Sequence, residues 1–254
     1  MTSAYWAVDN SLTMIGRSLR ISMRNLDALL LAVMLPIILM LMFVYVFGGA
    51  IETGTQYVNY VVPGIIILCA GFGSSTTAVS VAYDMENGIV DRFRSLPILG
   101  SAVLTGHVVA SVARNVVAMV LVMGVGLLLG WRPTATPVEW VAAIGVLVLF
   151  MVAFSYLAAS IGLLVRTVDA ASGATFAVTF LPYISSAFVP VDTMPGWLRP
   201  VAEHQPITPV IETVRGLLMG TPIGDSAWLA IAWFGGITLA SFLAAVALFK
   251  RRTA

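Results

Sequence analysis

Long apolar runs separated by short polar stretches dominate the chain. Six of these runs reach or approach the roughly 20 residues that a helix needs to cross a bilayer. We therefore predict six transmembrane helices, at residues 28–47, 57–82, 104–130, 138–165, 171–189 and 227–249. The first run is too long for the apolar part of a signal peptide and follows two aspartates, so we expect it to stay in the mature protein.

Residues 11–27 show a different pattern. Apolar residues recur there every three or four positions, whereas Arg17, Arg20 and Arg24 occupy another face of the same helix. This pattern predicts an amphipathic helix in the headgroup layer, with its arginines toward anionic lipid. A solvated helix that simply extends the first span is the alternative.

Residues 190–225 are broken by six prolines into apolar pieces that are too short to span a membrane. These pieces are also too apolar to lie in water. We therefore predict a helical segment that re-enters the outer leaflet and packs against spans five and six, where its backbone polar groups find protein partners. An ordinary outer loop is the alternative.

The amino-acid composition indicates that lipid surrounds most of the surface of this chain. Hydrophobic residues make up 59% of the 254 residues and charged residues only 10%, with a mean hydropathy of +0.99. Soluble domains carry about a quarter charged residues. The predicted fold is therefore a single all-α integral membrane domain at 1–254 with the lipid bilayer as a partner, and its net charge of +1 gives no reason to expect nucleic acid binding.

The cationic residues indicate the orientation. With six spans, most of them fall on the side of both termini: Arg17, Arg20, Arg24, Arg92, Arg94, Arg166, Lys250, Arg251 and Arg252. The positive-inside rule makes this side cytoplasmic, in a bacterial-type plasma (inner) membrane. Arg114 lies within the third span, and we expect its side chain to extend toward the cytoplasmic headgroups.

Several kinds of chemistry are missing from the sequence. Lys250 is the only lysine and ends the last span, so no phosphate-binding loop with its essential lysine can be present. The acidic residues fall at or outside the span ends, which argues against a proton relay. His107 and His204 are predicted at opposite faces and Cys69 stands alone, so we expect no catalytic site and no metal site in this chain.

Two polar stretches are candidates for function. Residues 71–77 of the second span are small and hydroxylated, which favours close helix packing, with a polar path as the alternative. The cytoplasmic loop at 84–97 combines acids, arginines and the aromatic Phe93. Such a loop could dock into a cleft of a cytosolic partner, or it could be a solvated loop.

This loop resembles the cytosolic coupling helix of type-2 ABC exporter permeases, the ABC-2 family with its daunorubicin-resistance and multidrug members. The family's acidic-Gly motif, basic pair and Leu-Pro are matched here by Glu86, Gly88, Arg92, Arg94, Leu96 and Pro97. Residues 188–220 resemble the family's outer re-entrant segment more specifically, through Pro195, Trp197, Leu198, Pro206, Arg215 and Gly216. Val189 and Pro190 depart from the small-residue turn of many members, and Gln205 replaces an Asn.

The resemblance implies a permease subunit of an ATP-driven exporter that moves an amphiphilic drug, lipid or similar compound outward. Its partners would be two copies of an ABC ATPase subunit, which bind the ATP and Mg, and a second permease, identical or related. No cofactor is expected in this chain. A scaffold that transports nothing and a secondary carrier are the alternatives.

The resemblance also implies site residues. Contacts with the ATPase would come from Glu86, Gly88, Asp91, Arg92, Phe93, Arg94, Leu96 and Pro97. Spans one, two and five would line the path. Candidates there are polar or aromatic residues on small-residue faces: Tyr57, Asn59, Tyr60, Ser74, Thr77, Thr175, Phe176, Thr179 and Tyr183.

Overall fold

The computed structural model describes residue 16, residues 26–88 and residues 100–253, and the regular structure in them is helical. The elements of the main bundle are α2 (Leu26–Met42) with its π-helical continuation η1 (Phe43–Phe47), α3 (Tyr57–Glu86), α5 (Gly100–Leu128), α6 (Pro137–Leu164), α7 (Val168–Thr179) and α10 (Ser226–Thr253). The elements between α7 and α10 are the 3-10 turns η2 (Leu181–Ile184) and η3 (Val191–Thr193) and the helices α8 (Arg199–His204) and α9 (Ile207–Met219).

Within the described ranges, four helices are long and apolar enough to cross a membrane, namely α3, α5, α6 and α10. They coincide within a few residues with the predicted spans two, three, four and six, so this chain has the make-up of a multi-pass membrane protein. The predicted spans one and five correspond to shorter apolar helices, Ala32–Phe47 and Val168–Ile184. The count of six crossings therefore stays a prediction.

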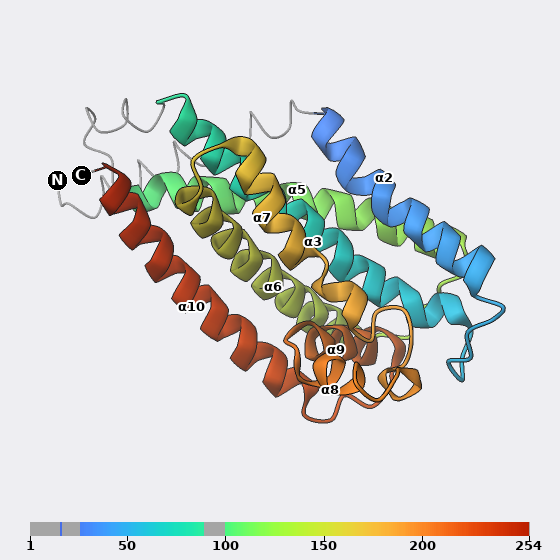
Figure 1. The fold of residues 1–254 in the computed structure, drawn as a ribbon. Coiled ribbons are helices and arrows are strands. Elements are labelled where there is room, and N and C mark those ends of the chain that lie inside the picture. Colours follow the sequence, from blue (N-terminus) through green and yellow to red (C-terminus); the bar gives the residue numbers. More distant parts are fainter. Residues whose placement is uncertain (1–15, 17–25, 89–99, 254) are drawn as a thin grey trace.

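Helices α2, α3, α5, α6, α7 and α10 lie side by side in one bundle (Figure 1). The short helices α8 and α9 gather at one end of this bundle, which we call the α9 end. The last turns of α3 and α10 lie at the opposite end, which we call the Asp84 end. Helix α3 lies in the middle, in contact with α2, α5, α6, α7 and α9, whereas α10 packs mainly on α6 and α9.

The burial of the side chains follows this arrangement. Four successive residues of α3, Ile65 to Leu68, are fully buried. A helix that is apolar and buried on every side must be surrounded by other helices. Helix α10 instead exposes large apolar residues such as Trp228 and Leu243, as expected of a helix that faces lipid.

Local sequence signals explain several helix ends. Helix α6 begins with a capping box in which the Thr136 hydroxyl accepts from the Glu139 backbone N–H and the Glu139 carboxylate accepts from the Thr136 backbone N–H. Pro137 occupies the first helical position, where a missing N–H costs nothing. Helix α9 ends at Met219 and is capped by Gly220, whose φ of 71° suits glycine.

Some predicted elements lie outside the described residues. These are Arg17, Arg20 and Arg24 of the interfacial helix and Asp91, Arg92, Phe93, Arg94, Leu96 and Pro97 of the coupling loop. The orientation of Arg114 differs from the expectation. Its Nη2 donates to Thr76 Oγ1 at 2.5 Å and to the Gly73 carbonyl at 3.4 Å, so the side chain binds α3 instead of extending toward the headgroups.

Candidate functional site: a polar clasp at the α9 end

The bundle has an irregular stretch of backbone where the fifth predicted span ends. Helix α7 stops at Thr179, the turn η2 contains Pro182, and Ser185 is extended with φ −125° and ψ −175°. Span five was predicted to continue to residue 189, but regular helix ends before that point. Carbonyl groups in such a stretch lack helical N–H partners and must find other donors inside an apolar protein.

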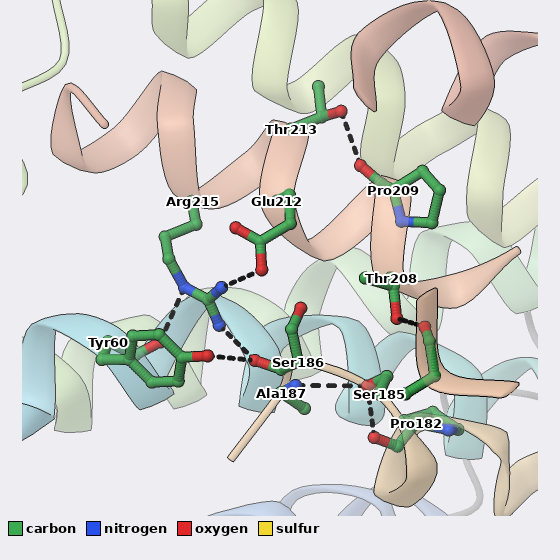
Figure 2. Close-up of polar contacts among 11 residues, drawn as sticks. Tyr60, Pro182, Ser185, Ser186, Ala187, Thr208, Pro209, Glu212, Thr213 and Arg215 are labelled. Carbon is green, nitrogen blue, oxygen red and sulfur yellow. Dashed lines mark hydrogen bonds and ion pairs between the residues drawn. The ribbon is translucent and has the colours of Figure 1, made fainter. Parts of the chain in front are cut away.

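Side chains from two other parts of the chain supply these donors. We call residues 184–188 the clasp segment, and the four donors Tyr57, Tyr60, Gln205 and Arg215 the clasp side chains. Gln205 Nε2 donates to the carbonyl of Ile184, and Tyr57 OH donates to that of Phe188 at 2.8 Å. The Ser186 carbonyl between them accepts from both Tyr60 OH, at 3.0 Å, and Arg215. Alternate carbonyls of the segment are therefore bonded by side chains. Figure 2 shows the two bonds to the Ser186 carbonyl.

Arg215 makes the most contacts of the four. Its Nη2 donates to the Ser186 carbonyl at 2.6 Å, and its Nε donates to the Tyr60 carbonyl at 3.1 Å. Its Nη1 pairs with Glu212 Oε1 at 2.6 Å, and its Cζ lies 3.8 Å from the centroid of the Tyr60 ring. The guanidinium is thus bonded in its plane and stacked on its face, a combination that lysine cannot reproduce. It joins α9 to both α3 and the clasp segment.

Arg215 and its counter-ion Glu212 differ in their exposure to solvent. The Arg215 side chain is only 4% exposed, whereas the Glu212 side chain is 33% exposed. A buried cation is tolerated when it is paired and hydrogen-bonded, and removing one partner of such a pair is strongly destabilising. The pair therefore places a cation that is bonded through each of its three nitrogens inside the bundle and keeps its counter-ion near the surface.

Close backbone contact completes the clasp. A Cβ atom added at Gly64 of α3 would lie 2.6 Å from the carbonyl oxygen of Ala187 and 2.7 Å from its Cα. Only glycine permits this approach. Within the segment, Ser185 Oγ donates to the Pro182 carbonyl and accepts from the Ala187 N–H, so the turn also bonds to itself (Figure 2).

A second polar region lies near the middle of the bundle, between α3, α5 and α6. Asn115 Nδ2 donates to Ser74 Oγ at 2.9 Å, and Ser155 Oγ donates to Ser111 Oγ at 3.0 Å. All four side chains are buried. We call these four residues the seam. Gly73 makes room for it, since a Cβ added there would lie 1.6 Å from Asn115 Oδ1.

The predicted path residues fall into separate groups. Tyr57 and Tyr60 belong to the clasp, and nearby Asn59 Oδ1 accepts from the backbone N–H of Arg132. Ser74 belongs to the seam. Phe176 is 60% exposed on α7 and packs against Phe180.

The remaining candidates are mostly buried. Thr77, Thr175 and Thr179 are buried, and Tyr183 stacks between Phe180 and Phe188. Thr175 and Thr179 line a small cleft between α3, α6 and α7, together with Ser75. Their hydroxyls donate to carbonyls of their own helix, so the cleft is apolar in character. The candidates thus do not form one continuous surface in a single copy of the chain.

The outer-segment candidates are placed by α8 and α9. Pro206 is the N-cap of α9, and Gly216 lies so close to Ile223 that a Cβ would reach its Cγ1 at 2.3 Å. Pro195 and Leu198 form the turn before α8, in which Leu198 N–H donates to the Pro195 carbonyl. Trp197 is 77% exposed there, as expected of an aromatic residue at a membrane interface.

The Asp84 end carries the beginning of the predicted coupling loop. Asp84 Oδ2 lies 3.2 Å from His107 Nε2, which joins the last turns of α3 to α5. Glu86 ends α3 and is exposed, and Gly88 follows with a φ of 63°. These contacts connect the two helices that flank residues 89–99 in the sequence.

Sequence reasoning missed Ser186, Gln205 and Asn115 as site residues. Asn115 was detectable in principle, because an amide within an apolar span calls for a polar partner. Ser186 acts through its backbone carbonyl, for which side-chain chemistry gives no signal. Among the described residues, no group of three His, Cys, Asp or Glu side chains could hold a metal ion.

The sequence of this chain is similar to those of a known protein family and of several named proteins. A sequence model of the family described as ABC-2 type transporter matches residues 10–219. The chain is 31% identical over 249 residues to a daunorubicin resistance ABC transporter permease protein of Streptomyces coeruleorubidus, covering 97% of this chain and 85% of that protein. It is 26% identical to a "probable doxorubicin resistance ABC transporter permease protein" of Mycobacterium tuberculosis, over 81% of this chain and 75% of that protein.

Proposed function

The chain belongs to the ABC-2 type transporter family, and on that basis we propose that it is the membrane-spanning permease subunit of an exporter driven by ATP. The observation that carries this proposal is the match along 97% of the chain to a permease of daunorubicin resistance. Since Lys250 is the only lysine and lies in the last turn of α10, the ATP must be hydrolysed on another subunit.

The proposed complex contains two permeases and two ATPase subunits, which hold the ATP and Mg. Both termini and the Asp84 end would face the cytoplasm across a bacterial-type plasma (inner) membrane, with six crossings, because cationic residues accumulate on that side. The α9 end would then face outward, with α8 and α9 as the re-entrant segment. Residues 84–97 would contact the ATPase next to the Asp84–His107 pair.

The proposed cargo is an amphiphilic compound of the daunorubicin or doxorubicin kind, because those drugs appear in the names of two relatives. The apolar character of the spans agrees with this choice. The path would run along α2, α3 and α7 and would be completed by the second permease. This accounts for candidates such as Phe176 that are exposed in the single chain.

A co-purification experiment tests the proposal. The tagged chain is isolated from its native membrane, the ATPase that travels with it is identified by peptides containing a Walker motif, and daunorubicin efflux is measured. Phe93→Ala combined with Arg92→Glu should abolish both co-purification and efflux without affecting membrane insertion. Trp197→Ala combined with Arg199→Glu is the matched control, since it makes an aromatic-to-alanine change and an arginine-to-glutamate change in the outer segment.

Each outcome separates the candidate functions. Loss with the first pair and retention with the second supports the permease assignment and the coupling role of the loop. If no ATPase accompanies the wild-type chain, a secondary carrier or a scaffold is correct instead. If the ATPase stays bound to the Phe93→Ala, Arg92→Glu variant and efflux continues, the coupling residues are wrong.

A further inference from the structure

The clasp segment is held in place by side chains of other elements, and such bonds allow the segment to move. Three of its carbonyls accept from side chains of α3, of α9 and of the turn before α9. Backbone that is bonded in this manner can separate from its partners without unwinding any helix. In an apolar environment, however, the separated carbonyls must find other donors, which only entering water can supply.

Two discrete arrangements follow from this requirement. In the observed one, the clasp is closed and dry, with Ser186 only 1% exposed. In the other, the carbonyls and the Arg215 guanidinium would be hydrated together. Because partly hydrated intermediates leave polar groups unbonded, the segment should switch between the two as a unit.

Helix α3 connects this unit to the opposite end of the protein. It is one continuous helix of 30 residues that carries Tyr57, Tyr60 and Gly64 at the α9 end and Asp84 at the other. A helix of that length spans about 45 Å. A displacement imposed next to Asp84 would therefore be carried along α3 to Gly64, which contacts the segment directly, and across Pro63 to Tyr60 and Tyr57.

We propose that Arg215 is the positioning residue that keeps the outer end of the translocation path closed, and that the path opens there when the clasp side chains release residues 184–188. This inference rests on the proposed function. Arg215 is the side chain of α9 that bonds both α3 and the segment, so its loss breaks the bonds of α9 to both and leaves Tyr57 and Tyr60 to join α3 to the segment. Its counter-ion Glu212 already reaches the surface, which favours hydration of the pair once the clasp opens.

A cysteine introduced in the clasp segment reports on the opening. The Ser186 side chain is buried and its Oγ has no hydrogen-bond partner in the described part of the chain. Ser186→Cys therefore leaves the clasp bonds, which use the backbone carbonyl, intact. The native Cys69 is buried in α3 and is replaced by Ala to remove its background. Labelling of the introduced thiol by a membrane-impermeant maleimide is then measured in membranes, with and without ATP.

Arg215→Gln in this background should accelerate labelling roughly tenfold or more without ATP, since bonds to a charged donor are lost. It should also remove most of the acceleration that ATP causes in the parent. Tyr60→Phe, which removes one bond to Ser186, should give a smaller acceleration. Thr213→Val is the matched control, because Thr213 is buried on the same helix but donates only to the Pro209 carbonyl of α9. It should label like the parent.

The outcomes are decisive for the clasp. Faster labelling in Arg215→Gln and Tyr60→Phe with unchanged Thr213→Val supports it. Equal labelling in Arg215→Gln and the parent overturns it, and so does equal acceleration in Thr213→Val, which would indicate general loosening. ATPase co-purification is measured in parallel. Its absence from the parent contradicts the proposed function, whereas its presence beside unchanged labelling contradicts the clasp alone.

Discussion

The clasp and the seam are both buried polar groups in an apolar bundle, yet they bond different things. The clasp side chains donate to carbonyls of irregular backbone, at Ile184, Ser186 and Phe188. The seam side chains bond mainly to one another across helices whose backbone is already paired. A bond lost at Ile184 or Phe188 therefore leaves a backbone carbonyl without its donor, and the Ser186 carbonyl is left so when both of its donors are lost. A bond lost in the seam leaves a small side chain unsatisfied.

Buried polar side chains therefore have two different roles inside this bundle. Side chains that bond other side chains fix the register of helices against each other, with modest energies of about 0.6 kcal/mol for an average pair. Side chains that bond irregular backbone decide whether a segment stays in place at all. The clasp should therefore tolerate less change than the seam, even though the seam lies deeper along the bundle.

The largest effect should come from Gly64→Ala in the clasp. The new Cβ would meet the backbone of Ala187 at 2.6 and 2.7 Å, and backbone cannot rotate away. Overpacking of this kind costs about 1–3 kcal/mol. We expect a clearly lower melting temperature of the detergent-purified protein, followed by tryptophan fluorescence.

Gly71→Ala on the same helix is the control for that measurement. Its Cβ would meet ring atoms of Phe150 and Phe154 at 3.9 and 4.0 Å, which is ordinary contact. Its melting temperature should equal or slightly exceed that of the parent, because alanine favours helix over glycine. Equal losses for the two variants would show that the clasp is not the sensitive site.

A smaller effect is expected from Gly73→Ala in the seam. Its Cβ would lie 1.6 Å from Asn115 Oδ1, but this neighbour is a side chain and can turn away. We expect a loss of about 1 kcal/mol, mainly from the broken bond between Asn115 and Ser74. The same melting assay measures it.

Asn115→Ala tests this explanation. Combined with Gly73→Ala, it removes the group that clashes, so the double variant should melt higher than the sum of the two single losses implies. Strict additivity would mean that the two residues do not interact and that the cost of Gly73→Ala has another origin. If Gly73→Ala alone lowered the stability as much as Gly64→Ala, the distinction between clasp and seam would be contradicted.

Much of the bundle was predictable because long apolar runs leave a chain few choices in lipid. Residues 57–82 and 138–165 were predicted as spans, and α3 and α6 cover them almost residue for residue. The end of the fifth span was not predictable in this way. Hydropathy scores residues 180–189 as apolar whether they are helical or not, and the donors that permit irregular backbone lie at distant positions such as Tyr60.

The candidate site was likewise only partly predictable from the sequence. Arg215 was expected in the outer re-entrant segment through family resemblance, but its contacts with Tyr60 and Ser186 exist only after folding. Arg114 was expected to extend toward the cytoplasmic headgroups, and it bonds α3 because Thr76 is within reach there. In each case the residue type could be interpreted from the sequence, but the group that the side chain bonds could not be predicted from it.

A still smaller effect is expected from Ser155→Ala. Ser155 donates to Ser111 between α6 and α5, and both hydroxyls are buried. The loss should be about 0.6 kcal/mol, the average for such bonds in membranes. Adding Ser111→Ala should cost little more, because it removes the hydroxyl that was left unbonded. Melting curves of the two variants check this, and a loss above that of Gly73→Ala would contradict the ranking.

The smallest effect should come from the exposed ion pair of α8, which shares the α9 end with the clasp. Arg199 Nε lies 2.7 Å from Glu203 Oε1, with side chains 50% and 41% exposed. The bond to Glu203 raises the pKa of Arg199 above its usual value, but solvent screens an exposed pair and holding it costs side-chain entropy. Arg199→Gln and Glu203→Gln should therefore melt like the parent at low and at high salt. A clear loss in either variant would mean that the α9 end is sensitive to any lost polar contact, and bonding to irregular backbone would no longer be what distinguishes the clasp.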